Sequence, residues 1–286
     1  MEEEAILTIS VITVVKNAET SIASTIDSLV SQTTDKFNIE YIIVDGESED
    51  NTWKIIEEYA VQISSVLSLV KVSQKDDSIY EAMDRGRKLA TGDFIFYLNS
   101  GDVFESTTVL KDVVQYMNNN KEKNCLYFGI VRINTVGLTW NVPNLNLASI
   151  DSNPLNSGYF PHHQSVFYPK VFYTQNTYDL KFKISGDVDY TMRACKTLPT
   201  KYMGITICSV QLDGMYSGKL NIAKILKEYD ERIYLMQKHD GRVSSLKKIV
   251  IIMILTGKYL SDTILGSRTK HLLMFLFSKY RSRLSA

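Results

Sequence analysis

The chain has 286 residues, of which 44% are hydrophobic, and its 32 basic and 32 acidic side chains give a formal net charge of zero. This length can bury a large core and favours one elaborated domain with a tail over two equal domains. Its three cysteines are odd in number and widely spaced, which argues against a disulfide framework or a cysteine-based zinc site and indicates a reducing cytoplasm.

Apolar periodicity predicts alternating strands and helices through residue 98. The predicted strands cover residues 6–15, 41–44, 67–72 and 94–98, and the predicted helices cover 21–30, 52–61 and 79–90. This alternation favours an α/β fold with a parallel sheet and helices on both faces. After residue 102, a helix at 108–117, a strand at 126–133 and a polar loop at 142–159 indicate a second half of mixed strands and long loops.

Three of these strands end in polar or acidic residues. The first runs into Lys16-Asn17, the second into Asp45-Gly46-Glu47, and the fourth into Asn99-Ser100-Gly101-Asp102. Ligands of open α/β sheets bind at the carboxyl edge of the strands, so this edge is the predicted site. The sequence has no Gly-x-Gly-x-x-Gly or Walker-type loop, which argues against a dinucleotide-binding or P-loop protein.

Five sequence blocks occur in a characteristic order: ISVITVVKN, EYIIVDGESEDNT, SIYEAMDRGRKLATGDFIFYLNSGD, HHQSVF and SGDVDYTMR. Over about residues 6–218 the chain resembles the family 2 glycosyltransferases of bacterial surface-polysaccharide assembly. The resemblance implies a GT-A-like fold, with a Rossmann-like central sheet and helices on both faces. It also implies a metal-dependent, inverting transfer of a sugar from a nucleotide-sugar, with a UDP-sugar favoured, to a hydroxyl of a growing, lipid-linked glycan.

The resemblance assigns four residues to donor binding. Asp45 opens a block similar to the family's Asp-Gly-x-Ser-x-Asp-x-Thr, whose first Asp contacts uridine, although Glu47 stands where Gly or Asn is usual. The alternative is that this segment only caps a helix. Thr13 either contacts the donor or satisfies its neighbours in the strand. Asp76 occupies the acidic position of the next block, although Asp77-Ser78 replaces the usual Lys-Gly.

The same block places Arg85 where a cation can face the donor phosphates, and the alternative is a solvated helix face. Tyr80, Ala82, Met83 and Leu89 are interpreted as helix packing.

Asp102 matches the last acid of the family's Asp-x-Asp signature, with Ser100 in place of the first acid. One carboxylate, two phosphate oxygens and waters suit a hard divalent cation, Mn²⁺ or Mg²⁺, which would stabilise the leaving diphosphate. The alternative for Asp102 is a helix N-cap.

Asp187 matches the second acid of the family's Glu-Asp-x-Asp-Leu-x-x-Arg pattern, with Gly186 in place of the Glu. It is the expected catalytic base of an inverting displacement, a role that contributes on the order of 10²–10⁴ in rate. The alternative makes Asp187 a helix cap, and Asp189 and Arg193 are interpreted as an i,i+4 ion pair.

Two further segments have open interpretations. His163, in the His-His-Gln block, either contacts the acceptor or diphosphate or is structural. Residues 213–218 resemble the family's Gly-Gly-x-Ser loop and form either a cover over the donor or an ordinary turn.

The carboxyl-terminal part carries the positive charge. From Arg242 onward there are nine Lys/Arg and one acid, a net charge of +8, and the apolar runs 249–255 and 272–277 fall short of the roughly 20 residues that span a bilayer. Such a tail favours attachment to an anionic membrane surface, and the alternative is a helix packed on the domain. It lacks interleaved recognition motifs, so no nucleic acid is expected as a partner.

The expected organisation is a catalytic domain at 1–240, with a nucleotide-sugar half at about 1–104 and an acceptor half at about 105–240, followed by a helical membrane-associating tail at 241–286. Because the amino terminus lacks the features of a secretory signal, the expected location is the cytoplasm, peripheral at the cytoplasmic face of the cell membrane. Two alternative functions remain: a noncatalytic glycan-assembly or membrane scaffold, and a sugar nucleotidylyltransferase, whose Gly-rich phosphate loop is not found here.

Overall fold

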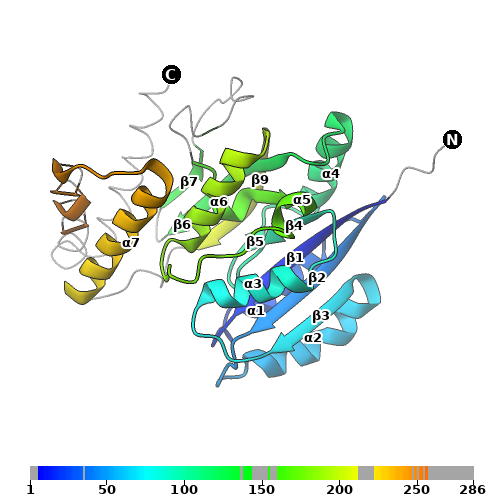
Figure 1. The fold of residues 1–286 in the computed structure, drawn as a ribbon. Helices are drawn as coiled ribbons and strands as arrows, with labels where there is room; N and C mark the ends of the chain where they lie inside the picture. Colours follow the sequence, from blue (N-terminus) through cyan, green and yellow to red (C-terminus); the bar gives the residue numbers. More distant parts are fainter. Residues whose placement is uncertain are drawn as a thin grey trace.

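The computed structural model describes residues 6–34, 36–135, 138–143, 154, 160–211, 222–246, 248–249, 251–253 and 255–256. In this part of the chain, strands and helices form a mixed α/β fold around one twisted sheet (Figure 1). The strand order is β3-β2-β1-β4-β8-β6-β9-β5, and β7 pairs with β6 outside this path. The predicted α/β class is confirmed.

The first half follows the predicted alternation of strands and helices. Its elements are β1 (Leu7–Val15), α1 (Ile22–Val30), β2 (Phe37–Asp45), α2 (Thr52–Val66), β3 (Ser68–Ser73), α3 (Ile79–Leu89) and β4 (Phe94–Tyr97). The pairs β1–β2, β1–β4 and β2–β3 are parallel. β2 begins earlier than predicted because Phe37 and Ile39 are buried while Asn38 between them is exposed, the alternation of a strand with one covered face.

The second half adds mixed strands. Its elements are β5 (Val103–Phe104), α4 (Val109–Asn120), β6 (Leu126–Thr135), β7 (Leu138–Val142), the short 3₁₀ helix η1 (His163–Ser165), β8 (Val166–Pro169), α5 (Lys170–Tyr173), α6 (Gly186–Thr197), β9 (Thr200–Gln211) and α7 (Ile222–Asp240). β8 pairs antiparallel with β4 and with β6, so one continuous sheet runs through both predicted halves. The strand β9 was not predicted, because polar residues interrupt its apolar pattern.

Two hydrophobic cores cover the two faces of the sheet. Along β1, Ile9, Val11 and Val15 pack with α1, α2 and α4, whereas Ile12 and Val14 pack with α3, α5 and α6. This alternation follows from the two-residue period of a strand. The predicted arrangement with helices on both faces is confirmed.

The register brings the carboxyl ends of the parallel strands together. Val15 lies beside Asp45, and Asp45 lies beside Ser73 on β3. On the other side of β1, Ile12 pairs with Tyr97, so β4 ends near the same edge and continues into Asn99–Asp102. The residues predicted for the site therefore follow neighbouring strands.

The three cysteines, Cys125, Cys195 and Cys208, are buried thiols. In the described part of the chain, no helix combines the length and apolarity needed to span a bilayer.

Candidate active site

Asp45 organises the turn that follows β2. Its side chain is fully buried, and its carboxylate accepts hydrogen bonds from the Ser48 amide (3.1 Å), the Ser48 hydroxyl (2.5 Å) and the Ser73 hydroxyl (2.6 Å). Glu47 within this turn has φ +56°, the left-handed conformation that Gly and Asn adopt more readily, which explains why they are usual there. Asp45 thus fixes the conformation of this turn at the carboxyl edge of the sheet.

Asp76 presents a more accessible carboxylate close to the same turn. A side chain at Gly46 would collide with the Asp76 carboxylate, so the glycine permits this close approach. The carboxylate is partly exposed and makes no hydrogen bond within the described residues. Burial raises its pKa, and the nearby Lys16 and Arg85 oppose that rise. Lys16 places a positive charge at the carboxyl edge of the sheet, and it was not among the predicted site residues.

Arg85 is turned toward the backbone of the segment between β3 and α3. Its guanidinium donates to the Gln74 carbonyl (3.1 Å) and the Lys75 carbonyl (3.2 Å), and it lies 3.5 Å from Glu81. The predicted solvated helix face is therefore not its environment. Its positive charge still lies near Asp76.

Thr13 lies inside the sheet. Its side chain is fully buried, and its hydroxyl donates to the Leu98 carbonyl (2.7 Å) and accepts from Tyr41 (3.1 Å). The Thr13 hydroxyl thus completes the hydrogen bonding of neighbouring residues, which is the predicted alternative to contact with the donor. It supports the strand ends that carry the site.

Asp102 is a buried carboxylate without a cationic partner among the described residues. Its side chain is 3% exposed and accepts a hydrogen bond from the Gln164 amide. Burial raises the pKa of Asp102 to about 8, against the opposing effect of Gln164. The predicted alternative of an N-cap is wrong, because β5 follows Asp102 and the N-cap of α4 is Thr108.

The turn that contains Asp102 offers oxygen ligands. The Asn99 side-chain oxygen is buried and has no hydrogen-bond partner in the described structure, and Gly101 adopts φ +93° as the chain turns between the two residues. Carboxylate and amide oxygens suit a hard divalent cation. The described residues contain no cluster of three or more His, Cys, Asp or Glu side chains suited to a metal. The available residues fit a cation whose coordination is completed by phosphate and water.

His162 and His163 lie beside Gln164 in the segment that enters β8. Burial lowers the pKa of each imidazole to about 4, and His163 also lowers that of His162. His163 Nδ1 lies 3.3 Å from the Tyr168 hydroxyl, and its Nε2 is buried without a partner in the described structure. A neutral His163 can contact a ligand by hydrogen bonding but not as a cation.

Asp187 lies in the first turn of α6. Its carboxylate accepts a hydrogen bond from the Tyr80 hydroxyl (3.0 Å), and burial raises its pKa while Tyr80 and then the Val188 amide oppose the rise. Tyr80 was interpreted as packing only; it is buried, but its hydroxyl also holds Asp187. The N-cap of α6 is Ser185, so the interpretation of Asp187 as the cap is wrong.

Gly186 explains the departure from the family's Glu-Asp pair. A Cβ at this position would lie 2.7 Å from the Tyr80 ring, closer than packed atoms come. The glycine therefore lets α6 begin directly against α3. Leu89 at the end of α3, which was also interpreted as packing, is 37% exposed.

Asp189 has a structural role. The predicted ion pair with Arg193 is confirmed at 2.9 Å, and Lys238 and His239 on α7 lie 2.8 and 2.9 Å from its other oxygen. Its side chain is fully buried. The contribution of α7 was not predicted, since helical spacing in α6 indicates only the partner on the same helix.

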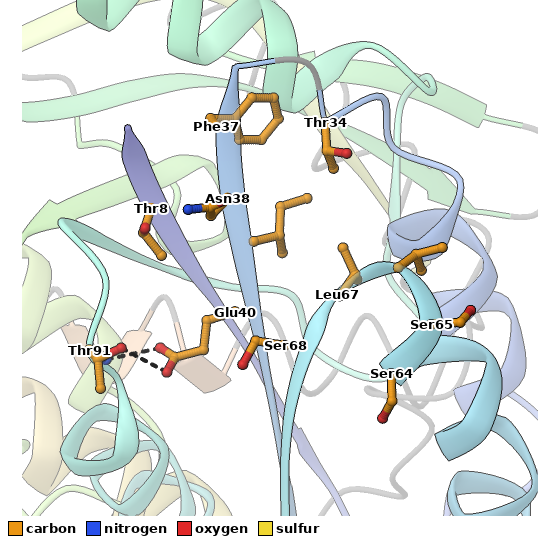
Figure 2. Close-up of a pocket in the computed structure, with 12 residues that line it drawn as sticks. Thr8, Thr34, Phe37, Asn38, Glu40, Ser64, Ser65, Leu67, Ser68 and Thr91 are labelled. Carbon is orange, nitrogen blue, oxygen red and sulfur yellow. Dashed lines mark hydrogen bonds between the residues drawn. The ribbon is translucent and has the colours of Figure 1, made fainter. Parts of the chain in front are cut away.

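A hollow of about 590 Å³ lies at the opposite, amino-terminal edge of the sheet (Figure 2). It is lined mainly by hydroxyl and amide side chains, and Glu40 is its carboxylate. Both oxygens of Glu40 are already bonded, one to the Thr91 hydroxyl (2.9 Å) and the other to the Thr91 amide (2.9 Å) and the Ser10 hydroxyl (2.5 Å). Because the Glu40 carboxylate is already hydrogen-bonded, we take the carboxyl edge of the sheet, and not this hollow, as the candidate active site.

The sequence model of the family described as Glycosyl transferase family 2 matches residues 10–192, which include the turns after β1, β2 and β4 and the start of α6. The chain belongs to glycosyl transferase family 2. This glycosyltransferase is 26% identical over 221 residues to a PGL/p-HBAD biosynthesis glycosyltransferase of Mycobacterium bovis, covering 76% of this chain and 82% of the relative. It is 29% identical over 110 residues to a poly(ribitol-phosphate) beta-glucosyltransferase of Bacillus spizizenii, covering 36% of this chain and 16% of that one.

Solved structures share the fold of this glycosyltransferase. S. aureus TarS 1–349 in complex with UDP-GlcNAc has a TM-score of 0.63 at 18% identity and covers 90% of this chain and 74% of TarS 1–349. The mannosyltransferase PcManGT from Pyrobaculum calidifontis, in complex with GDP-Man and Mn²⁺, has a TM-score of 0.59 at 12% identity, with 97% and 83% covered. The predicted GT-A-like fold and the predicted enzyme class are confirmed, and the scaffold and nucleotidylyltransferase alternatives are set aside.

Some predicted features lie outside the described residues. They are the loop at 213–218, the apolar run at 272–277, most of the polar loop at 142–159 and most of the tail at 241–286.

Proposed function

We propose that this glycosyltransferase moves a sugar from a UDP-sugar to a hydroxyl of a growing, lipid-linked surface glycan, with inversion at the anomeric carbon. The observation that carries the proposal is the Asp187 carboxylate, which is held by Tyr80 at the start of α6 and has a raised pKa. A carboxylate in this state is a stronger base than an exposed one. The neighbour in complex with UDP-GlcNAc supports the donor class, and the relative named poly(ribitol-phosphate) beta-glucosyltransferase supports a polymer as the acceptor.

On the donor side, Asp45 shapes the nucleoside pocket from inside, and Asp76 supplies the accessible carboxylate. Lys16 and Arg85 place positive charge next to Asp76, where it favours a diphosphate. Thr13 supports the strand from which this edge is built.

Asp102, with the Asn99 side-chain oxygen three residues earlier in the same turn, would hold Mn²⁺ or Mg²⁺. When bound, such a cation supplies charge that stabilises the leaving diphosphate. The buried Asp102 carboxylate gains a partner in this way, which removes the cost of an isolated buried charge. The solved neighbours with Mn²⁺ support this assignment.

In the chemical step, the acceptor oxygen forms a bond to the anomeric carbon as the bond from that carbon to the diphosphate oxygen breaks. The acceptor proton moves to Asp187, and the electron pair of the broken bond leaves with the nucleoside diphosphate. Attack on the face opposite the leaving group inverts the anomeric carbon. Neutral His163 offers a hydrogen bond to the acceptor or to the diphosphate.

The carboxyl-terminal segment suits a peripheral position on an anionic membrane. After α7, Leu255 is buried together with Ile225, so one side packs on α7 as the packing alternative expects. Leu246, Ile249 and Met253 are 71%, 54% and 67% exposed. These apolar side chains and the surplus of Lys/Arg after residue 241 match an anionic bilayer surface.

The test combines a donor screen with one substitution. UDP release from several UDP-sugars is measured with and without a lipid-linked acceptor, and the best donor is then used with Asp187→Asn. We expect the variant to bind UDP and Mn²⁺ like the wild type and to lose about 10²–10⁴ in maximal rate. If none of the UDP-sugars yields UDP when the acceptor is present, the transferase proposal is contradicted. If Asp187→Asn keeps the wild-type maximal rate, Asp187 is not the base.

A further inference from the structure

A single carboxylate on α7 holds the segment that leads into α6. One oxygen of Glu231 accepts from the Lys183 amide (2.8 Å), and the other accepts from the amides of Ile184 (2.8 Å) and Ser185 (3.1 Å). The Glu231 side chain is 7% exposed. Three consecutive backbone amides thus share one buried acceptor, and hydrogen bonds to a charged group are the stronger kind.

This contact fixes the chain immediately before α6, on the outer side of its first turn. A helix begins with backbone amides that lack partners, which an N-cap side chain commonly satisfies. Ser185, the N-cap of α6, makes no such side-chain bond. Glu231 binds the amide of this N-cap residue and the two amides before it, and Asp187 follows two residues later. The direction in which α6 begins therefore depends on α7.

α7 is itself anchored on both sides of this segment. Lys238 lies 2.8 Å from both Asp179 and Asp189, and Tyr234 donates to Asp179 at 3.0 Å. His239 lies 2.9 Å from Asp189. These contacts hold the chain before and after Asp187, with α7 (yellow to orange in Figure 1) as the common support.

We propose that Glu231 is a positioning residue for Asp187. It fixes the entry into α6 so that the Asp187 carboxylate stays within reach of the Tyr80 hydroxyl and of the acceptor hydroxyl. The inference rests on the proposed role of Asp187 as the base. α7 lies outside residues 10–192, so the family match does not include this support.

The test compares Glu231→Ala and Glu231→Gln with Glu228→Gln. Glu228 is a matched control because it is also a buried carboxylate of α7, 5% exposed, and it accepts a hydrogen bond at 3.0 Å from Arg232 on the same helix. Maximal rate is measured with the best donor of the screen, and binding is measured with UDP and Mn²⁺. We expect Glu231→Ala to lose about 10- to 100-fold in kcat, a part of what a general base contributes, with UDP affinity within about twofold.

Two further measurements separate positioning from a loss of stability. Hydrogen exchange should show faster exchange at the amides of residues 183–185 in both Glu231 variants and not in Glu228→Gln. In an Asp187→Asn background, Glu231→Ala should reduce kcat little further, because residues that act through one group are not additive. Glu231→Gln keeps the side-chain volume and one acceptor oxygen, so it remains informative if the Ala variant does not fold.

The outcomes distinguish this inference from the proposed function. If Asp187→Asn retains the wild-type rate, the base assignment is wrong. If Asp187→Asn is slow but Glu231→Gln matches Glu228→Gln in kcat and in exchange, the positioning role alone is overturned. Equal losses of kcat and UDP affinity in Glu231→Gln would also overturn it, since these indicate general unfolding.

Discussion

Asp45, Asp102 and Asp187 are three of the carboxylates of the candidate site, and their hydrogen-bond partners differ. Asp45 accepts three hydrogen bonds from Ser48 and Ser73, Asp187 accepts one from Tyr80, and Asp102 accepts one from Gln164. Burial raises the pKa of Asp102 to about 8. These environments predict different effects of substitution at each residue.

Asp102→Ala should largely abolish turnover and Mn²⁺-dependent UDP binding while the protein stays folded. In the wild type, Mn²⁺ competes with the proton on Asp102, so UDP affinity measured with Mn²⁺ should rise from pH 6 to pH 8, by at most about tenfold per pH unit. Calorimetry with UDP, with Mn²⁺ or with chelator, measures this dependence. Unchanged affinity and turnover in the variant would remove Asp102 from the site.

The same raised pKa predicts the pH dependence of stability without metal. Folded Asp102 retains its proton up to about pH 8, whereas the unfolded carboxyl loses it near its ordinary pKa of 3.8. The contribution of Asp102 to the free energy of unfolding is therefore greatest below pH 4 and is lost between about pH 4 and pH 8. Subtracting the urea-unfolding curve of Asp102→Asn at each pH isolates this contribution; a difference that is constant with pH would contradict it.

Asp45 and Asp76 should respond differently to substitution. Asp45→Ala removes the acceptor of three partly buried hydrogen bonds, so it should weaken UDP binding and also destabilise the fold by roughly 1–3 kcal/mol. Asp76→Asn, at a carboxylate without hydrogen bonds in the described structure, should weaken UDP binding with little change in stability. Urea unfolding measures the change in stability, and calorimetry measures UDP affinity. If Asp76→Asn destabilised the fold and Asp45→Ala did not, the roles assigned to the two carboxylates would be wrong.

At the scale of elements, the active site depends on how closely α6 approaches α3. Gly186 has no side chain that would collide with the Tyr80 ring. The Tyr80 hydroxyl can therefore reach the carboxylate of Asp187, the next residue. The start of one helix and the face of another thereby define the position of the Asp187 carboxylate.

Gly186→Ala should push the start of α6 away from α3. Because the new Cβ would lie 2.7 Å from a buried ring, we expect a loss of about 1–3 kcal/mol in stability and a lower kcat with nearly unchanged UDP affinity. Ser185→Ala is the neighbouring control, since the Ser185 side chain makes no capping bond. A Gly186→Ala enzyme with wild-type kcat would show that the spacing of α3 and α6 is unimportant for the reaction.

At the scale of the molecule, the carboxyl edge of the sheet carries the site, and the segment after α7 carries exposed apolar side chains and positive charge. The packed side of that segment, which includes Leu255, is distinct from its exposed side. A substitution on the exposed side can therefore test membrane contact without removing the packing on α7.

A chain with Leu246→Glu, Ile249→Glu and Met253→Glu should keep its fold and UDP binding but lose association with anionic vesicles. The positive charge attracts the surface and is screened by salt, whereas apolar contact resists salt, since the Debye length falls from about 10 Å at 0.1 M to about 3 Å at 1 M. Flotation of both chains, and of one truncated after Asp240, at low and high salt measures this. A wild-type chain that does not float at low salt would contradict the membrane proposal.

Much of the fold was predictable because its signals are local. The strands that became β1 to β4 and the helices α1 to α3 follow from apolar periodicity, and Asp45 and Asp102 follow from the polar ends of those strands. β9 escaped prediction because Lys201, Ser209 and Gln211 interrupt its pattern, and its pairing with β6 and β5 compensates for this. Hydrogen bonds between strands that are far apart in the sequence leave no periodic pattern in either strand.

The sequence by itself determined the family resemblance, the alternating α/β class and the carboxylates at the strand ends, because each depends on residues that are neighbours in the chain. The tertiary structure alone decided which partners those carboxylates meet. Tyr80 and Asp187 are 107 residues apart, and Glu231 and Ile184 are 47 apart. Such contacts arise when separate helices pack, so only the folded chain brings the Asp187 carboxylate, its hydroxyl partner and the support from α7 together.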